Sequence, residues 1–345
     1  METMTLRHAL ERLIEGRDLS REEARQAMRI IMDGEATPSQ IGALMALMRM
    51  KGETIDEITG FVETMRSKAT KVETGLKGLL DTCGTGGDGG RTFNISTAAS
   101  IIAAAGGVPV AKHGNRAMSS KSGSADVLEA LGVNISLNPE QAAECLREVG
   151  ICFMFSQLYH QSMKHAAAPR KELGFRTFFN ILGPLTNPAG ADIQLMGVYD
   201  RDKTEFIARV MRELGLKRAL VVSSYEGLDE ISICSPTQVT ELNEGEIRTY
   251  TVTAGDLGLA ECGIEEIAGG KAEENAQILR NIYAGQKGPK RDIVLANAAA
   301  CFYVAGRCSS LREGVQYAEE IIDSGKALAK LEELIDYTGA LRHVS

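Results

Sequence analysis

The stretch LLDTCGTGGDGGRTFNISTAASIIAAA, residues 79–105, predicts a strand, a glycine-rich loop and a helix in succession. The strand ends near residue 82, and an Ala/Ile-rich helix covers residues 97–105. Five glycines between them, at positions 84, 86, 87, 89 and 90, let the backbone approach an anion closely. The helix N-terminus adds unpaired N–H groups and the positive end of its dipole, with Ser96 or Thr97 as the expected N-cap. The stretch therefore predicts a phosphate-binding turn.

The glycine spacing is compatible with three kinds of phosphate loop, and also with a tight turn that binds nothing. Gly84-x-Gly86-x-x-Gly89 fits the dinucleotide fingerprint, but that fingerprint expects an acidic residue about 20 positions further on for the ribose. Here a basic segment follows the next strand, where the fingerprint expects an acid. Basic side chains would bind a further phosphate group and not a ribose hydroxyl. A P-loop needs Gly-Lys-Ser/Thr after its first glycine, which this loop lacks. The third possibility is a loop that binds a sugar phosphate or a pyrophosphate in another way. In such a loop the Asp88 carboxylate would accept a hydrogen bond from a ribose hydroxyl or from a metal-bound water.

A second polar loop, KHGNRAMSSKSGS at residues 112–124, follows the strand predicted at 108–111. It contains three cationic side chains, four serines and two glycines. Lysine and arginine supply charge while hydroxyls and amides complete the hydrogen bonds, which suits a pyrophosphate and a 5′-phosphate. A flexible polar loop is the alternative. We expect Ser124 to be the N-cap of the next helix, and we assign His113 no general-base role.

Composition and charge narrow the class of protein. The chain has 345 residues, enough for one large domain or two ordinary ones, and a formal net charge of −8. A general nucleic-acid surface would be basic, so we expect no nucleic-acid partner. No run approaches the ~18 apolar residues of a membrane helix, and the charged amphipathic N-terminus is unlike a signal peptide. We therefore expect no membrane association.

The cysteines indicate a compartment. They are odd in number and include no Cys-x-x-Cys pair, which is typical of small buried residues in a reducing environment. We therefore expect a cytoplasmic protein. The cysteines stand at positions 83, 145, 152, 234, 262, 301 and 308.

Residues 1–70 predict a small helical bundle domain. Four short helices follow one another, each opened by a capping signal. The expected N-caps are Thr5, Ser20, Thr37 and Thr54. We expect helices from about residues 160–185 to join this domain, with residues 178–182 packing against it.

Residues 71–345 predict a larger α/β domain with a mostly parallel central sheet, because strand and helix patterns alternate. The fold class is therefore α/β, with the helical bundle domain N-terminal to the α/β domain. Residues 238–242 and 247–252 predict an antiparallel hairpin, and the tail from about residue 271 is mostly helical. The other expected strands lie near residues 78–82, 108–111, 133–137, 151–155, 193–199 and 219–223.

An acidic pair, Asp229 and Glu230, follows the strand predicted at 219–223. Loops at the carboxyl ends of strands form the sites of α/β proteins. Because Mg²⁺ is commonly held by one or two carboxylates together with substrate phosphates, the pair is a candidate metal site. A solvated acidic loop is the alternative reading.

Long ordered motifs resemble the anthranilate phosphoribosyltransferase family over essentially the whole chain. They are GTGGDGG…NIST, KHGNRAMSSKSGSADVLEALG, APRKELGFRTFFNILGPLTNP and GLDE. The resemblance implies transfer of phosphoribose from phosphoribosyl pyrophosphate to the amine of anthranilate, in the second step of tryptophan biosynthesis from chorismate. It also implies Mg²⁺, with two ions per subunit, a homodimer, and a fold shared with pyrimidine nucleoside phosphorylases.

The resemblance also assigns site residues, and it suggests no dedicated general base. For anthranilate it implies Gly84, Asn115 and Arg170, although Arg170 alone would be taken for a surface loop residue. For Mg²⁺ it implies Ser96, Asp229 and Glu230. For phosphoribosyl pyrophosphate it implies Gly84, Gly87, Asp88, Thr92, Asn94, Ile95, Ser96, Thr97, Lys112, His113, Gly114, Asn115, Arg116, Ala117, Met118, Ser119, Ser120 and Ser124.

Two other functions remain open at this point. A pyrimidine nucleoside phosphorylase has a similar Ser-Gly-Ser-Ala-Asp-Val-Leu-Glu turn, but it would use inorganic phosphate and need no acidic metal pair. A catalytically silent relative that binds nucleic acid is disfavoured by the net charge of −8.

Overall fold

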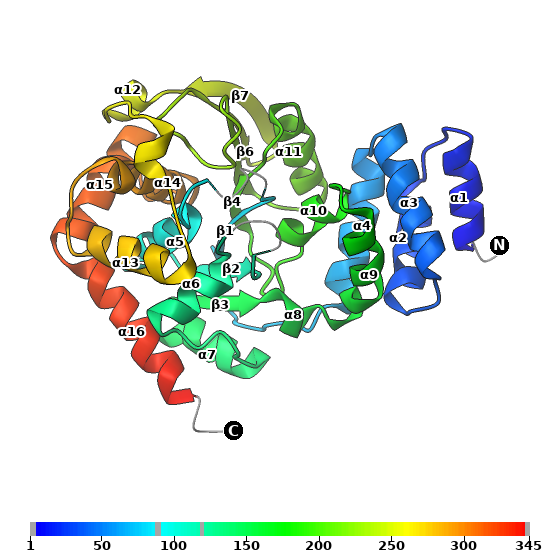
Figure 1. Ribbon diagram of the computed structural model, residues 1–345, viewed down its shortest axis with the longest axis horizontal. Helices are drawn as coiled ribbons and strands as arrows, with labels where there is room; N and C mark the ends of the chain where they lie inside the picture. Colours follow the sequence, from blue (N-terminus) through cyan, green and yellow to red (C-terminus); the bar gives the residue numbers. More distant parts are fainter. Residues whose placement is uncertain (1–4, 87–90, 118–120, 342–345) are drawn as a thin grey trace.

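The computed structural model describes residues 5–86, 91–117 and 121–341. Figure 1 shows a bundle of the first four helices at one end of the molecule and an α/β body at the other. The helices are α1 (Leu6–Ile14), α2 (Arg21–Met32), α3 (Pro38–Lys51), α4 (Ile55–Lys68), α5 (Ile95–Ala105), α6 (Ser124–Leu131), α7 (Pro139–Glu148), α8 (Ser156–Tyr159), α9 (Lys164–Leu173), α10 (Phe179–Leu182), α11 (Thr204–Glu213), α12 (Ala254–Leu257), α13 (Ala272–Tyr283), α14 (Pro289–Val304), α15 (Leu311–Asp323) and α16 (Lys326–Ala340).

One sheet runs through the body in the order β3-β2-β1-β4-β5-β6-β7. Strands β1 to β5 are parallel to one another, β6 pairs antiparallel with β5, and β6 and β7 form the predicted antiparallel hairpin. The chain leaves β1 towards β2 on one side and returns to β4 on the other, so the strand order switches between β1 and β4, where α/β folds bind ligands. The strands are β1 (Leu80–Gly84), β2 (Val110–Gly114), β3 (Ile151–Phe155), β4 (Ile193–Gly197), β5 (Arg218–Ser224), β6 (Thr237–Asn243) and β7 (Glu246–Val252).

The two faces of the sheet belong to different hydrophobic cores. Alternate residues of a strand point to opposite faces, so Leu220 belongs to the core that contains residues of α5 and α14, while Val221 belongs to the core that contains residues of α11 and the helical bundle. Leu195 and Met196 on β4 divide in the same way. The bundle core is therefore continuous with one face of the sheet, which holds both parts of the molecule against the same strands.

The predicted bundle starts are confirmed. The N-caps of α1 to α4 are Thr5, Ser20, Thr37 and Thr54, and each makes a complete capping box with the third residue of its helix. The local sequence pattern was enough to predict these helix starts. A capping box pairs the free amides at the start of a helix with side chains that lie within four residues of one another in the chain. The predicted packing of residues 178–182 is also confirmed, since the ring of Phe178 stacks on that of Phe61 in α4 at 4.9 Å between centroids.

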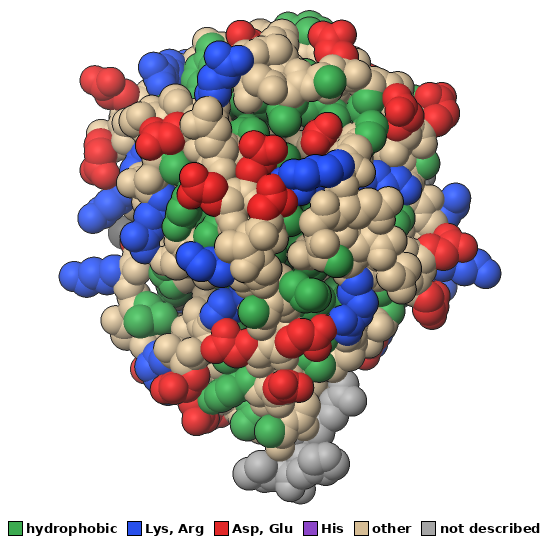
Figure 2. Space-filling model, turned by 90° about the vertical axis from the view of Figure 1, so that its left-hand side faces the viewer, with side chains coloured by type: hydrophobic (Ala, Val, Ile, Leu, Met, Phe, Trp, Pro, Cys, Tyr) green, Lys and Arg blue, Asp and Glu red, His purple; other side chains and the backbone are tan. Residues whose placement is uncertain are grey.

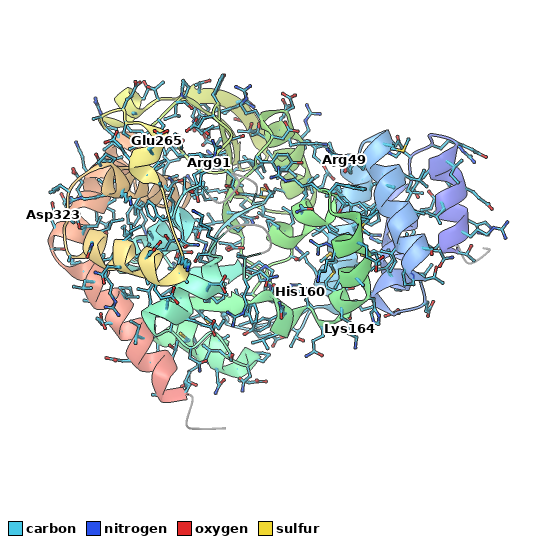
Figure 3. All side chains as sticks on the ribbon, in the orientation of Figure 1. Arg49, Arg91, His160, Lys164, Glu265 and Asp323 are labelled. Carbon is cyan, nitrogen blue, oxygen red and sulfur yellow. The ribbon has the colours of Figure 1, made fainter. Side chains whose placement is uncertain are left out.

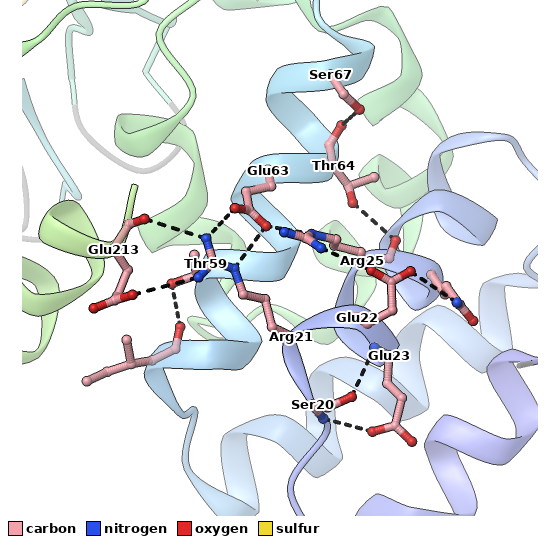
Figure 4. A network of polar contacts seen from close by, with 12 residues as sticks. Ser20, Arg21, Glu22, Glu23, Arg25, Thr59, Glu63, Thr64, Ser67 and Glu213 are labelled. Carbon is pink, nitrogen blue, oxygen red and sulfur yellow. Dashed lines mark hydrogen bonds and ion pairs between the residues drawn. The ribbon is translucent and has the colours of Figure 1, made fainter. Parts of the chain in front are cut away.

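An ion-pair network joins the bundle to the body (Figure 4). Glu63 on α4 accepts hydrogen bonds from Arg21 and from Arg25 on α2, with Arg25 Nε 2.6 Å from Glu63 Oε2. Arg21 also lies 3.7 Å from the carboxylate of Glu213, the last residue of α11. The hydrogen bond from Arg21, assisted by Arg25, lowers the pKa of Glu63 to about 2 against the opposing effect of burial. The network therefore stabilises the ionised form of Glu63.

The strand expected at residues 133–137 is wrong. Val133, Ile135 and Leu137 are buried in the alternating manner of a strand, but the segment pairs with no other strand. Instead Asn134 N donates to Thr338 Oγ1 on α16 at 3.1 Å. Alternating burial arose because the segment crosses beneath a helix, so the pattern alone could not distinguish it from a strand.

The surface carries charges of both signs. Figure 2 shows Lys and Arg side chains interspersed with Asp and Glu on the face formed by α13, α15 and α16, without a continuous basic area on that face. In the ranges that the structure describes, no helix combines the length and the apolar character needed to traverse a bilayer.

Candidate active site

The predicted phosphate loops and the acidic pair meet at the carboxyl ends of β1, β2, β4 and β5. Asp229 and Glu230 lie in the loop after β5, as expected from their position in the chain. Gly86 N in the glycine-rich loop donates to Asp229 Oδ2 at 2.9 Å, and Ser96 N at the start of α5 donates to Glu230 Oε1 at 3.1 Å. The two carboxylates therefore contact two different amides of the predicted anion-binding turn.

Two glycines make room for the acidic loop. Gly84 and Gly197 are register partners at the ends of β1 and β4. A Cβ on Gly84 would overlap Asp229 Oδ2, and one on Gly197 would overlap the backbone carbonyl oxygen of Asp229. Gly197 was missed by the sequence prediction, because a single glycine at the end of a strand gives no local signal of a long-range contact.

The start of α5 differs from the expectation. The N-cap is Asn94 rather than Ser96 or Thr97, and its side chain makes no cap hydrogen bond. Asn94 Nδ2 instead donates to the carbonyl of Ser122 in the second loop at 3.1 Å, and Asn94 Oδ1 accepts from Asn275 Nδ2 at 3.0 Å. Glu230 takes the capping position from a distant part of the chain, which no local pattern reveals. The side chain of Thr97, by contrast, is buried.

Lys112 lies beneath the site. Its side chain is 2% exposed, and Nζ donates to the Thr82 carbonyl, to Thr82 Oγ1 at 3.1 Å and to Ser96 Oγ at 3.3 Å. Burial lowers the pKa of Lys112, an effect that nearby Asp81 partly opposes. Burial also raises the pKa of Asp81 to about 6, although hydrogen bonds and Lys112 act against it. The lysine is thus held in the interior, joining β1 to the first turn of α5.

His113 and His160 form a buried pair beside Lys112. Their ring centroids are 5.1 Å apart, and Figure 3 labels His160 just before α9. Burial lowers the pKa of His113 to about 3 and that of His160 to about 4. Both imidazoles are therefore neutral near pH 7.

The second loop is closed by an acid on α6. Asp126 Oδ2 accepts from Ala117 N at 3.0 Å and from Gly123 N at 2.8 Å, so Gly123 is the N-cap and Ser124, expected there, is the first helical residue. Arg116 pairs with Asp126 and Glu129, and these hydrogen bonds raise its pKa. Much of the charge of Arg116 is therefore balanced within the loop itself.

Asn115 and Gly114, which precede Arg116, are held in place by hydrogen bonds and by close packing. Asn115 Oδ1 accepts from Arg116 N at 2.8 Å, and the Asn115 carbonyl accepts from Ala125 N at 3.2 Å. Gly114 fits between Phe153 and Ser124, which a Cβ would contact at 2.7 and 2.9 Å. The loop backbone is consequently packed closely against β3 and α6.

Arg170 lies on helix α9, not on a loop as the sequence suggested. Its guanidinium carbon is 5.2 Å from the ring centroid of Phe179, within cation–π range. Burial lowers the pKa of Arg170, but a guanidinium stays charged at neutral pH. A helix that packs on α2 and α3 therefore presents a partly buried cation.

A third segment supports the glycine-rich loop, and sequence reasoning did not find it. Thr92 forms a β-bridge with Ala268, and Gly269 N donates to the Arg91 carbonyl at 3.0 Å. Gly269 is needed because a Cβ there would overlap Phe93. The Gly269-Gly270 doublet was the available signal. The predicted site residues Gly87, Asp88, Met118, Ser119 and Ser120 lie outside the described residues.

The oxygen atoms at the site fit a magnesium ion. Asp229 and Glu230 supply carboxylates, and Ser96 supplies a hydroxyl that keeps a second lone pair beside the one facing Lys112. In residues 5–86, 91–117 and 121–341 no group of three or more His, Cys, Asp or Glu side chains could hold a metal ion. A site with two carboxylates suits Mg²⁺, which retains waters and takes substrate phosphates as ligands.

Comparison with known proteins identifies two family models in the chain. Residues 76–328 match the α/β domain of a glycosyl transferase family, and residues 7–69 match its helical bundle domain. Together they span most of the described body and bundle.

Individual relatives align over nearly their full length. An anthranilate phosphoribosyltransferase of Acetivibrio thermocellus is 54% identical over 335 residues, 97% of each chain. The crystal structure of the Thermus thermophilus anthranilate phosphoribosyltransferase superposes with a TM-score of 0.91 at 42% identity, covering 96% of this chain and 99% of that one. The enzyme of Saccharomyces cerevisiae in complex with phosphoribosyl pyrophosphate and Mg has a TM-score of 0.88 at 27% identity, covering 97% and 98%. The same yeast enzyme in complex with 4-fluoroanthranilate has a TM-score of 0.88 at 25% identity, covering 97% and 98%.

Proposed function

The chain belongs to the anthranilate phosphoribosyltransferase family, and from this premise we propose a Mg²⁺-dependent transfer of phosphoribose to anthranilate. The donor is 5-phosphoribosyl 1-pyrophosphate, and the products are N-(5-phosphoribosyl)anthranilate and pyrophosphate. The observation that carries the proposal is the meeting of two carboxylates with two amides of one anion-binding turn, Asp229 at Gly86 N and Glu230 at Ser96 N. We place the reaction second in tryptophan biosynthesis from chorismate.

The glycine-rich loop and the start of α5 are our proposed donor site. Backbone amides at a helix N-terminus bind phosphate well, and glycine lets them approach it. Arg116 and the loop at 112–124 extend the site for a second phosphate. Thr92 and Asn94 also belong to the proposed binding site for phosphoribosyl pyrophosphate. Both contact the segment after residue 267, and this supports a fixed spacing between the two loops.

Asp229, Glu230 and Ser96 are our proposed magnesium ligands, with two ions per subunit. Bound Mg²⁺ supplies charge stabilisation to the departing pyrophosphate. The chain itself must orient the two carboxylates, and this is supported by Gly84 and Gly197, which leave the space that the acidic loop fills.

The chain contributes mainly by positioning its substrates. We assign anthranilate to Gly84, Asn115 and Arg170, because a guanidinium can pair with a carboxylate through two hydrogen bonds. The anthranilate amine attacks ribose C1′ as the C1′–O bond to pyrophosphate breaks, and the proton leaves the amine without a dedicated protein base. Holding both substrates in line supplies much of the rate. We further propose a homodimer that works in the cytoplasm.

The first test follows anthranilate fluorescence over time with phosphoribosyl pyrophosphate, with and without Mg²⁺. We expect a decay that requires both additions. A folded protein without decay would exclude the proposed activity, and uridine or thymidine with inorganic phosphate would then test a nucleoside phosphorylase.

A further inference from the structure

Cys234 and Cys262 bring their thiols together although they are 28 positions apart in the chain. Their Sγ atoms are 3.4 Å from each other, and both side chains are half-buried. The backbones meet as well, because Cys262 N donates to the carbonyl of Ile233 at 3.3 Å. Both thiols are reduced in this structure. The two segments are therefore already aligned for a bond between their side chains.

Partial exposure distinguishes this pair from the cysteines of the core. Cys145, Cys152 and Cys301 are fully buried, where a dissolved oxidant does not reach them. Cys308 is half-buried like Cys234. It therefore provides a control for exposure without the adjacent thiol.

We propose that Cys234 and Cys262 are a redox modification site, which a low-molecular-weight disulfide such as oxidised glutathione converts into an intramolecular disulfide. One thiolate attacks the glutathione disulfide, forms a mixed disulfide and releases one glutathione thiolate. The second thiolate attacks the mixed disulfide, forms the Cys234–Cys262 bond and releases the other. Two protein thiols are oxidised and one glutathione disulfide is reduced to two thiols, because the two released glutathione thiolates take up the two protons that the protein thiols lose. Burial raises the pKa of Cys234 and raises that of Cys262 to about 12, so the reaction speeds up at alkaline pH.

A short series of hydrogen bonds connects the Cys234–Cys262 pair to Asp229 and Glu230. Ser232 Oγ accepts from Cys234 N at 2.9 Å and itself donates to Glu226. Ile231, the neighbour of Glu230, is held by Asn297, whose Oδ1 accepts from Ile231 N at 3.0 Å. The segment from Glu226 to Cys234 is thus one hydrogen-bonded unit that contains Asp229 and Glu230.

The partner segment reaches the glycine-rich loop. Cys262 precedes η4 (Ile264–Ile267), after which Ala268 and Gly269 pair with Thr92 and Arg91. Figure 3 labels Arg91 and Glu265 on this side of the body. A disulfide requires its sulfurs about 2.05 Å apart, so closing it draws together two segments whose sulfurs are now 3.4 Å apart. Displacement of a site by about 1 Å can cost on the order of a hundredfold in rate.

The test begins with the reduced full-length protein treated with oxidised glutathione at pH 8. We expect titratable thiols to fall by two and peptide mapping to find Cys234 joined to Cys262. Cys234→Ser and Cys262→Ser should each lose this bond, while Cys308→Ser should form it as the wild type does. If the treated wild type shows glutathione on Cys308 but no Cys234–Cys262 bond, the proposal is overturned, and this result does not depend on any variant folding.

The effect on catalysis rests on the proposed function and is measured separately. We expect oxidation to reduce the rate at limiting Mg²⁺ by about tenfold or more, and dithiothreitol to restore it. Cys262→Ser should keep its rate under the same treatment. A mapped disulfide with an unchanged rate would overturn the coupling to the acidic loop. A protein with no activity before oxidation would instead refute the proposed function, and peptide mapping would still test the disulfide.

Discussion

Lys112 Nζ lies 3.3 Å from Ser96 Oγ, beneath the first turn of α5. The same ammonium donates to both oxygens of Thr82, the central residue of β1. This buried cation joins β1 to the first turn of α5, and both elements lead into the donor site that we propose. Its positive charge also adds to the field of the helix N-terminus.

Replacing Lys112 with Met should lower the free energy of unfolding by about 2–4 kcal/mol. The change removes the ammonium that donates to the Thr82 carbonyl and leaves Asp81 without its nearby cation in the interior. Urea unfolding at pH 7 measures the loss, and Lys121→Met, on an exposed lysine of the second loop, is the matched control. If Lys112→Met weakened donor binding at unchanged stability, the ammonium would face the ligand instead.

Replacing Gly197 with Ala should disrupt the acidic loop. The added Cβ would overlap the carbonyl of Asp229, a backbone atom that cannot rotate away, so the loop must shift. We expect a loss of about 2–4 kcal/mol in unfolding free energy and a raised requirement for Mg²⁺. Gly42→Ala is the control, because a Cβ on that α3 glycine meets no atom within 4 Å. A Gly197→Ala enzyme with wild-type metal dependence would contradict the role of this packing.

Replacing Asp229 with Asn and Glu230 with Gln should raise the Mg²⁺ concentration for half-maximal rate by about tenfold or more. Each amide keeps a carbonyl oxygen that can accept from Gly86 N or Ser96 N, but the negative charge for the metal is lost. Rates over a magnesium titration at saturating donor measure the shift, with Glu265→Gln on the exposed surface as control. Unchanged metal dependence in both variants would remove the acidic pair from the metal site.

The elements that sequence predicted well are those governed by neighbours in the chain. Thr5, Ser20, Thr37 and Thr54 satisfy amides within four residues, so their patterns identify the helix starts directly. The acidic pair was placed on the correct loop because the carboxyl ends of parallel strands share one edge.

The errors concern interactions between distant segments. Glu230 caps α5 from 134 positions away, so Ser96 and Thr97 only looked like caps. Lys112 was predicted to contact phosphoribosyl pyrophosphate, and the local pattern gave no sign of the contacts with Thr82 that its buried ammonium makes. Neither outcome could be predicted without knowing which segments meet in space.

Replacing Glu63 with Gln should destabilise the protein in a pH-dependent way. Hydrogen bonding from Arg21 lowers the pKa of Glu63 to about 2 in the folded state, below its ordinary value of 4.5. A lowered carboxyl pKa contributes stability that is present above about pH 4.5 and is lost as the pH falls towards 2. With partial solvent screening we expect about 1–2 kcal/mol at pH 7 and less at pH 3, measured by urea unfolding.

The control for Glu63 is Glu11→Gln, which removes an exposed ion pair with Arg7 on α1. Exposed pairs contribute little, so this variant should change the unfolding free energy by under about 0.5 kcal/mol. An equal loss at pH 7 and pH 3 for Glu63→Gln would mean that packing, and not ionisation, is responsible.

Replacing Arg170 with Ala should raise the KM for anthranilate by about tenfold to a hundredfold, with a smaller change in the KM for the donor. A charge-assisted hydrogen bond to a carboxylate contributes roughly 1.5–3 kcal/mol, which corresponds to that range. Arg170→Lys should recover only part of the loss, because an ammonium cannot form the two parallel hydrogen bonds of a guanidinium. Lys171→Ala, at the exposed neighbouring position on α9, controls for helix charge. If only the donor KM rises in Arg170→Ala, the cation that rests on Phe179 serves the phosphoribosyl group and anthranilate must be held elsewhere.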